Sequence, residues 1–382
     1  MDHTIEHSML FHEMNDNKSS DTTSKSSLIS GGTIGGIRRI RKLTPEEEEV
    51  YRKKLALENE IYGTGIVSDR IFSNIKKYEH EEYQYLNLLE NILENGFWEE
   101  GRNGKTKSIF GQSMRFSLKD NKIPILTTKK TAWKTCLKEL LWFIRGETDN
   151  KILKKQGVHI WDANASREFL DSRGLTLTRE DLIGPGYGYQ WRYFNANYNC
   201  FSGKRLLDND PNDVHKETTA FKGVDQLQQI IDALKDPKQR TSRRLVMTAW
   251  NPCQLHQMAL PPCHILCQFN VHDGNKLSCA MVQRSCDFFL GSCFNIASYS
   301  FLTHLLAKHC GLEAYEFVYF MGNVHLYENA IDAVKLQITR EPFEFPTFSI
   351  KEIRENINDY QVEDFEIHNY KSHEAIKVAM VA

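Results

Sequence analysis

The sequence predicts an α/β protein built on a large mixed sheet with flanking helices. Two patterns alternate along the chain. Apolar residues at spacings of three and four indicate amphipathic helices, and short apolar or alternating runs indicate strands. The two patterns do not follow a strict strand–helix–strand repeat, so an all-parallel sheet is not expected. With 382 residues, the chain is long enough for one or two domains with a sizeable core.

Individual elements follow from these patterns and from the turn residues between them. Helical spacing is found in three segments: 85–93, 131–146 and 297–310. Strand-like runs are found in three others: 245–250, 265–271 and 277–283. Asn95-Gly96 is a typical end for the first helix, and Asp273-Gly274 offers a hairpin turn between the last two strands. The polar stretch from 195 to 223 predicts a long surface loop.

The first 80 residues differ in texture from the rest of the chain. Residues 1–43 are rich in Ser, Thr, Gly and charge and show no sustained apolar period, so we expect a disordered tail. Residues 44–80 open with an N-cap, a proline and a glutamate, which predicts a helical extension or linker. Residues 81–382 have the texture of one continuous domain.

Composition excludes several classes of protein. Lys and Arg number 48 against 50 Asp and Glu, a net charge of −2, so no global basic field indicates nucleic-acid binding. No run approaches the roughly 18 apolar residues of a membrane span, and the N-terminus lacks the pattern of a secretory signal. We expect a cytoplasmic protein whose nine cysteines are reduced. The basic cluster at 38–42 leaves a nuclear location or an RNA contact open without indicating either.

One cysteine stands in a setting that suits a nucleophile. Pro261-Pro262-Cys263-His264 fixes the backbone immediately before a predicted strand. A buried strand-start cysteine is the alternative, because free cysteine is among the most buried residue types. A zinc site is another, since five candidate ligands lie within fifteen positions: Cys253, His256, Cys263, His264 and Cys267. There is no Cys-x2-Cys pair among them, and a strand would send residues 263 and 264 to opposite faces, so we expect no metal.

Several arginines occupy predicted loop edges. Arg243-Arg244 precedes one strand, Arg284-Ser285 follows another, and Arg102 lies in a Gly-rich turn. Arginine together with serine suits multidentate binding of phosphate, although surface ion pairing explains any single arginine equally well. A cationic cluster near Cys263 would also raise the thiolate fraction of its side chain.

Signature blocks between about residue 81 and the C-terminus resemble those of the thymidylate synthase family. The blocks are Leu126-Thr127-Thr128-Lys129-Lys130, Glu139-Leu140-Leu141-Trp142-Phe143, Pro261-Pro262-Cys263-His264, Ser285-Cys286-Asp287, Phe294-Asn295-Ile296-Ala297-Ser298-Tyr299 and Gly322-Asn323-Val324-His325-Leu326-Tyr327. They occur in order from about residue 81 to the C-terminus. The resemblance implies the family's fold, a homodimer packed through the sheet, and reductive methylation of dUMP to dTMP. The one-carbon donor and reductant would be 5,10-methylenetetrahydrofolate, which leaves as dihydrofolate.

The resemblance also implies the catalytic groups. Cys263 would add to C6 of the uracil, and Arg284 would bind phosphate beside the sulfur. Glu139, with Tyr187 and His264, would manage the proton transfers. Asn295 would accept from uracil N3–H and donate to O4, a pairing that an ionised carboxylate could not complete. In the related deoxycytidylate hydroxymethylases this position is an Asp, so Asn295 favours a uracil substrate.

Two sets of binding residues follow from the same blocks. The expected dUMP contacts are Arg102, Arg243, Arg244, Gln283, Arg284, Ser285, Asp287, Asn295, His325 and Tyr327, with Arg243 and Arg244 reaching in from the other subunit of the dimer. The expected folate contacts are Lys129, Ile160, Trp161, Asn164, Asp287, Leu290, Gly291 and Phe294, with Lys129 meeting the polyglutamate tail. Met380 to Ala382 would form a C-terminal lid that excludes water from methylene transfer.

Four positions depart from the family pattern: Gly101, Gly186, Cys293 and Asn323. None removes a catalytic group, and the glycines predict looser loops and altered folate affinity. The family's fused versions carry a dihydrofolate reductase before the synthase, and residues 1–80 are too few to contain one. The alternatives are a hydroxymethylase on the same scaffold, against which Asn295 argues, and a non-catalytic nucleotide- or RNA-binding protein, against which the intact catalytic set argues.

Overall fold

The computed structural model of this chain describes residues 80–101, 103–206 and 222–379. The predicted tail at 1–43 and nearly all of the predicted extension at 44–80 lie outside these residues. So do Arg102, Met380 and Ala382, and the central part of the predicted loop at 195–223.

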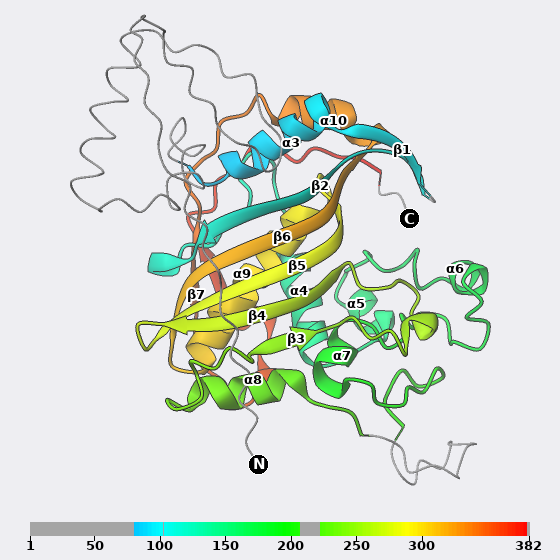
Figure 1. The fold of residues 1–382 in the computed structure, drawn as a ribbon, viewed down its shortest axis with the longest axis vertical. Helices are drawn as coiled ribbons and strands as arrows, with labels where there is room; N and C mark the ends of the chain where they lie inside the picture. The colour runs from blue at the N-terminus through cyan, green and yellow to red at the C-terminus, as the bar shows by residue number, and fades with distance from the viewer. Residues whose placement is uncertain (1–79, 102, 207–221, 380–382) are drawn as a thin grey trace, which may run out of the picture. The chain divides into compact units, whose positions relative to one another are not determined.

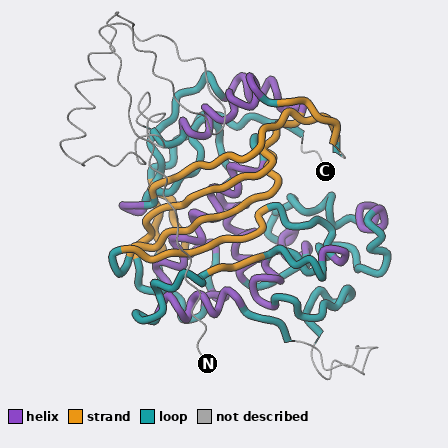
Figure 2. The backbone as a smooth tube through the Cα atoms, in the orientation of Figure 1, coloured by secondary structure: helices purple, strands orange, loops and turns teal. Residues whose placement is uncertain are grey.

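A six-stranded mixed sheet forms the centre of the described fold (Figures 1 and 2). Its strands are β1 Phe97–Gly101, β2 Gly104–Ser117, β3 Val246–Thr248, β4 His264–His272, β5 Lys276–Asp287 and β6 Glu313–Tyr327. Their order across the sheet is β1-β2-β6-β5-β4-β3. Only β5 and β6 run parallel within this sheet, and the other neighbours are antiparallel. The predicted mixed α/β fold is therefore confirmed.

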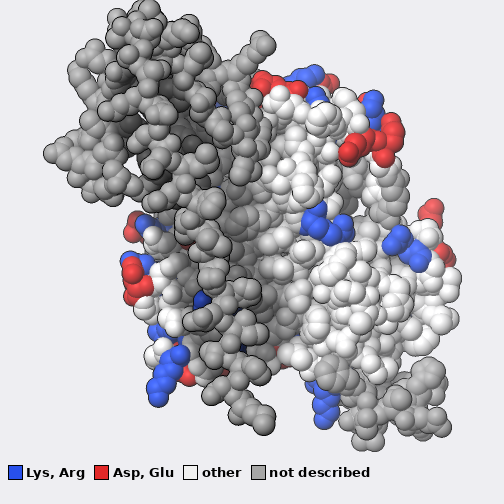
Figure 3. Space-filling view, viewed as in Figure 1, with Lys and Arg blue, Asp and Glu red and all other residues white. Residues whose placement is uncertain are grey.

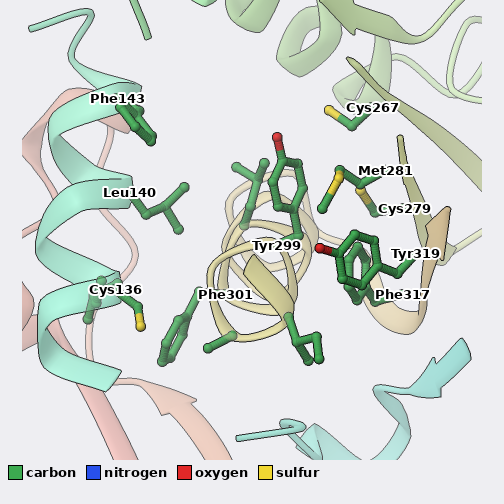
Figure 4. Packing of buried hydrophobic residues seen from close by; sticks show 14 of the residues in the cluster. Cys136, Leu140, Phe143, Cys267, Cys279, Met281, Tyr299, Phe301, Phe317 and Tyr319 are labelled. Carbon is green, nitrogen blue, oxygen red and sulfur yellow. The ribbon is translucent and has the colours of Figure 1, made fainter. Parts of the chain in front are cut away.

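Helices flank the sheet and supply most of the remaining core. They are α3 Tyr83–Asn95, α4 Trp133–Ile144, α5 Asn150–Lys155, α6 Arg167–Ser172, α7 Gly188–Tyr193, α8 Gln226–Lys235, α9 Gly291–His309 and α10 Ile331–Gln337. Helix α9 packs against β5 and β6, and α4 packs against α9. Figure 4 shows α9 between α4 and the strands, with Tyr299 and Phe301 pointing into the core on different sides. A small second sheet pairs β7 Thr347–Ile350 with β8 Phe365–His368.

Helix α9 begins six residues before the predicted start at 297. The helix is buried nearly all round, so its sequence lacks the one-sided apolar spacing that marks a surface helix. The Asp287 carboxylate accepts a hydrogen bond from Leu290 N at 3.0 Å, directly before the first turn. Leu290, Gly291 and Asn295 therefore lie at a helix start. The other two helix predictions are confirmed with shifts of a few residues.

Strand β5 is longer than the sequence predicted, and this corrects the expected positions of Arg284 and Ser285. Both residues lie within the strand rather than after it. Strand β4 begins only at His264, but the parallel partner β6 continues to pair with β5 as far as Asp287. The sequence pattern could not predict this extension, because beyond Gln283 the strand is continued by its pairing with β6. The predicted hairpin is confirmed: Asp273 and Gly274 both have positive φ, at 45° and 80°.

Within the described ranges, no helix has both the length and the apolar character needed to cross a membrane. Figure 3 shows basic and acidic side chains scattered over the described part of one face, around a large area that carries neither. That part of the surface therefore presents no continuous basic patch of the kind that nucleic-acid binding uses.

Candidate active site

Cys263 lies in a turn that Arg284 fixes at three points. Arg284 N donates to the Cys263 carbonyl at 2.8 Å. The guanidinium donates from Nε to the Pro262 carbonyl and from Nη2 to the Pro261 carbonyl, both at 2.9 Å. Its cation also lies 5.4 Å from the centre of the Trp250 ring. The carbonyls of Pro261 and Pro262 therefore hold the Arg284 guanidinium in the same turn that carries the Cys263 thiol.

Tyr187 contacts the same turn, although it lies 76 positions earlier in the sequence. Its hydroxyl accepts a hydrogen bond from Cys263 N at 2.9 Å. The tyrosine precedes α7 in an unusual backbone conformation, with φ 42° and ψ −107°. Such a conformation persists only when the surroundings enforce it. Here α7 packs closely on α4, because a Cβ on Gly188 would lie 2.2 Å from the Phe143 carbonyl oxygen.

Gly188→Ala is therefore expected to lower the free energy of unfolding by about 3 kcal/mol, because the added methyl group forces α7 away from α4. Gly186→Ala is the matched control. Among the described residues, and apart from its two chain neighbours, no atom lies within 4 Å of a Cβ at Gly186, and its φ is not positive. This change should therefore alter stability by less than about 1 kcal/mol. Urea denaturation of both variants makes the comparison. Equal stabilities would contradict the close packing of α7 on α4.

Glu139 provides a carboxyl group whose proton is available near neutral pH. Its Oε1 accepts a hydrogen bond from Trp161 Nε1 at 2.7 Å. Burial raises the pKa of Glu139 to about 7, although the hydrogen bond from Trp161 acts in the opposite direction. The Trp161 ring lies 5.7 Å from the Tyr187 ring, which connects this carboxyl group to the cysteine turn. A group that exchanges a proton near pH 7 is suited to general acid–base catalysis.

His264 lies on the other side of the Tyr187 ring, with the two ring centres 4.4 Å apart. Its Nδ1 is 2.8 Å from the Tyr299 hydroxyl. Burial lowers the pKa of His264 to about 3, so its imidazole is neutral at physiological pH. This residue can relay or position a proton, but it does not supply a charge.

The ends of β5 and β6 bring together the predicted nucleotide contacts. Asp287 pairs with His325, and Ser285 pairs with Asn323. The Gln283 amide is held at both ends: its Oε1 accepts from the Tyr319 hydroxyl at 2.6 Å, and its Nε2 donates to the Ser285 carbonyl at 2.9 Å. The sequence reasoning missed Tyr319 as a support, because it occupies an ordinary inward position on its strand.

Asn295 lies in the first turn of α9, where it is partly exposed. Within the part of the chain that the structure describes, its side-chain amide has no hydrogen-bond partner. Its oxygen lies close to Gly291, since a Cβ there would be 3.9 Å away. The amide is therefore available to a bound molecule at the start of this helix.

The predicted folate contacts come from two regions of the chain. Leu290, Gly291 and Phe294 lie at the start of α9, next to Asp287, whose pKa is raised by burial. The other three, Ile160, Trp161 and Asn164, lie in the segment that reaches the site through the contacts of Trp161 with Glu139 and Tyr187.

Lys129 lies differently from its predicted role. Its side chain is buried, and its ammonium donates to the Phe289 carbonyl and lies 3.7 Å from the centre of the Phe289 ring. In this position the ammonium faces the protein interior, so contact with a polyglutamate chain would require the side chain to turn outward.

Arg243 and Arg244 are exposed in the turn before β3. Among the described residues, neither guanidinium has a hydrogen-bond or ion-pair partner. Metal ligands are also not assembled: across 80–101, 103–206 and 222–379, no three His, Cys, Asp or Glu side chains come together in a way that could hold a metal ion. His264, one of the zinc candidates, instead contacts Tyr299.

The four departures have specific surroundings. Cys293 is buried, and its Sγ lies 3.1 Å from the Leu290 carbonyl. Asn323 Oδ1 lies 2.8 Å from His325 Nδ1. Gly186 has room for a side chain, so the glycine adds backbone freedom directly before the strained Tyr187. A Cβ on Gly101 would lie 3.2 Å from the Gly104 carbonyl oxygen.

The mixed sheet thus carries a site in which an arginine binds a cysteine turn, and ring contacts connect that turn to a carboxyl group that titrates near neutrality. The sequence model of the family described as thymidylate synthase matches residues 83–382. The chain belongs to the thymidylate synthase family, which confirms the resemblance seen in the sequence blocks.

Three curated relatives share the printed name "Bifunctional dihydrofolate reductase-thymidylate synthase". The chain is 48% identical to the protein of Leishmania major over 303 residues, which are 79% of this chain and 55% of the relative. It is 46% identical to the protein of Plasmodium berghei (strain Anka) over 315 residues, which are 82% of this chain and 50% of the relative. It is 42% identical to the protein of Zea mays over 354 residues, which are 90% of this chain and 63% of the relative. The matches thus span half to somewhat under two thirds of these relatives.

Proposed function

We propose that the protein catalyses the reductive methylation of dUMP to dTMP, with 5,10-methylenetetrahydrofolate as co-substrate. The observation that carries this proposal is the arrangement around Cys263. Its turn is held by three hydrogen bonds from Arg284 and one contact to Tyr187, and Glu139 is connected to it through Trp161. The thiolate is the nucleophilic form of a cysteine side chain, and we assign the role of nucleophile to Cys263.

Cys263 adds to C6 of the uracil, and the electron pair of the C5–C6 double bond makes C5 nucleophilic. The methylene carbon of the folate bonds to C5 as one of its two carbon–nitrogen bonds breaks, and the second breaks once C5 has lost its proton, which frees tetrahydrofolate. A hydride from that tetrahydrofolate then reduces the carbon to a methyl group, and dihydrofolate leaves. The C5 proton is removed between these steps, and loss of the Cys263 sulfur from C6 restores the double bond. Each bond made to sulfur is therefore broken again, and the thiolate is regenerated.

We assign proton transfer and binding of the sugar to other residues around the base. Glu139 titrates near neutral pH, so it can exchange protons at the C4 and C5 positions, directly or through water. Tyr187 orients the cysteine turn and, with the neutral His264, completes the proton path. We assign binding of the sugar to His325 and Tyr327, which lie on β6, the strand beside β5.

The dUMP phosphate would be bound by Arg284, Ser285 and Arg102. We further propose a homodimer in which Arg243 and Arg244 complete the phosphate site of the other subunit. Their exposed guanidinium groups have no partner among the described residues, which supports a role toward a bound molecule.

The residues at the start of α9 fit a folate. The pterin has hydrogen-bonding edges and two apolar faces, and the region offers the Asp287 carboxyl beside the apolar side chains of Leu290 and Phe294. The Trp161 segment contributes a large aromatic surface and the Asn164 amide. We propose that Met380 to Ala382 close over this site.

Asn295→Asp is expected to shift substrate preference from dUMP toward dCMP. The free amide can accept from N3–H and donate to O4 of uracil, and an ionised carboxylate can only accept. The ratio of kcat/KM for dUMP to that for dCMP should fall by about 100-fold, since discrimination by such paired groups is large. Steady-state kinetics with both nucleotides measures it, and an unchanged ratio would remove Asn295 from base selection.

Product analysis tests the proposed reaction. Purified full-length protein is incubated with dUMP and 5,10-methylenetetrahydrofolate, and the nucleotides and folates are separated by chromatography. Equal amounts of dTMP and dihydrofolate are expected. A hydroxymethylated nucleotide with tetrahydrofolate would show that water rather than hydride completes the reaction, and unchanged dUMP would overturn the proposal.

A further inference from the structure

A buried carboxylate outside the predicted site organises a turn beside it. Glu82 is fully buried immediately before α3. It accepts hydrogen bonds from Thr127 N and Oγ1 at 2.9 and 2.6 Å, and from Thr128 N and Oγ1 at 2.8 and 2.6 Å. Four donors from two consecutive residues therefore converge on one side chain 45 positions earlier.

Each of the two threonine hydroxyls also accepts a hydrogen bond, which fixes the direction of its own proton. Thr127 Oγ1 accepts from Phe343 N, and Thr128 Oγ1 accepts from Gln337 Nε2, both at 2.9 Å. Each hydroxyl therefore receives one hydrogen bond and gives its own proton to Glu82. A carboxylate can accept from all four donors, whereas an amide at the same place would present two hydrogens to them.

The turn held by Glu82 carries the C-terminal segment. His373 N donates to the Thr127 carbonyl at 2.7 Å. The Tyr370 hydroxyl donates to the Leu126 carbonyl at 2.8 Å and accepts from Thr131 N at 3.0 Å. These contacts hold residues 370–373 against the turn.

Arg340 ties the same turn to the segment a second time. Its Nη1 donates to the Thr128 carbonyl at 2.8 Å and to the Glu374 carbonyl at 2.9 Å. Figure 1 shows α3 and α10 together at one edge of the sheet, with the C-terminal segment, drawn in red, running beside them.

The turn also reaches the start of α9 through Lys129, the residue that follows Thr128. The Lys129 ammonium donates to the Phe289 carbonyl and lies over the Phe289 ring. Phe289 directly precedes Leu290, and Asp287 caps the same loop through Leu290 N. The loop that carries Asp287, Leu290 and Gly291, three of the proposed folate contacts, is therefore held by the turn through Lys129.

The geometry points to Glu82 as a positioning residue that holds in place both the Asp287–Gly291 loop and the C-terminal segment, and so shapes the folate half of the site. The folate role rests on the proposed function. Glu82 is fully buried and out of reach of a bound substrate, so it acts through the Thr127–Thr128 turn. Arg284 and Ser285 on β5, like the cysteine turn, lie outside this loop, and of the proposed dUMP contacts on β5 Asp287 alone belongs to it.

Glu82→Gln tests the inference, with Glu81→Gln as the matched control. Glu81 is the neighbouring carboxylate, and it accepts from Ser117 N at 2.7 Å and pairs with Lys122, away from the turn. In Glu82→Gln we expect the KM for methylenetetrahydrofolate to rise about tenfold, as the loss of a charge-assisted hydrogen bond predicts, and the KM for dUMP to change by less than about twofold. Glu81→Gln should change neither.

Hydrogen exchange of the free protein provides a readout that does not depend on activity. In Glu82→Gln, the amides of 287–291 and 370–379 should exchange about tenfold faster than in the wild type and in Glu81→Gln. If exchange were faster in Glu82→Gln as expected, but wild-type protein turned over no dUMP, the proposed function would fail and the positioning role would stand.

Unchanged exchange in both segments, or equal rises in the two KM values, would overturn the inference.

If Glu82→Gln does not fold, Thr128→Val decides, because it removes one of the four donors without changing the shape of the side chain. It should raise the folate KM about threefold and speed exchange in the same segments. Wild-type values in Thr128→Val would then overturn the inference.

Discussion

Cys263→Ser is expected to lower kcat for dUMP by about 10⁴-fold or more, the scale on which enzymes lose activity when their nucleophile is removed. A serine hydroxyl is un-ionised at neutral pH and adds poorly to C6. Binding of dUMP should be retained, because Arg284 contacts the backbone carbonyls of residues 261–263 and not the sulfur. Initial rates and calorimetric titration with dUMP measure the two quantities.

Cys253→Ser is the matched control for this experiment. Cys253 is an exposed free cysteine ten positions earlier, and its replacement should leave both turnover and binding unchanged. Substantial turnover in Cys263→Ser, or an equal loss in Cys253→Ser, would contradict the assignment of the nucleophile.

Glu139→Gln is expected to lower kcat by about 10²- to 10⁴-fold, the usual contribution of a positioned acid–base group. The amide keeps the shape of the side chain and can still accept from Trp161, but it cannot exchange a proton near pH 7. A pH–rate profile of the wild type should show an ionisation near pH 7 that the variant lacks. Retained activity with an unchanged profile would place the proton transfers elsewhere.

The same variant should change how stability depends on pH. The pKa of Glu139 is about 7 in the folded protein, above the ordinary value of 4.5, so the folded state keeps a proton that the unfolded state loses between these values. The free energy of unfolding should therefore fall as pH rises through this window, by about 3 kcal/mol in total, with no further loss above it.

Glu139→Gln lacks this titration, so its stability relative to wild type should improve by that amount between about pH 4 and pH 8. Urea denaturation at the two ends of the window measures the difference. The exposed Glu168→Gln is the control and should track the wild type. If Glu139→Gln also tracked the wild type, the raised pKa would be contradicted.

Much of the fold was predictable because local signals and tertiary packing agree. Helix α3 has one apolar face, and the hairpin at Asp273-Gly274 uses residues that tolerate positive φ. The position of Cys263 before a strand also followed from its two prolines. Where packing alone decided the outcome, prediction was wrong: α9 is buried nearly all round, and the end of β5 is sustained by one parallel partner.

The candidate site was also predictable only in part. The sequence blocks predicted which residues would meet, but not which groups support them. Tyr299 and Tyr319 appear as ordinary core residues, yet their hydroxyls position His264 and Gln283. Glu82 carried no signal, because its four donors lie 45 positions away and only the folded chain brings them together. The sequence also gave no reason to expect a buried Lys129.

The central claim is that a thiol at Cys263 drives methylation of dUMP with the folate as reductant. The most direct measurement follows the absorbance change that accompanies oxidation of methylenetetrahydrofolate to dihydrofolate, after mixing wild-type protein with dUMP, with dCMP, or with neither. We expect a rise with dUMP only, and none with dUMP in the Cys263→Ser variant. No rise with wild-type protein that binds dUMP tightly would contradict the account.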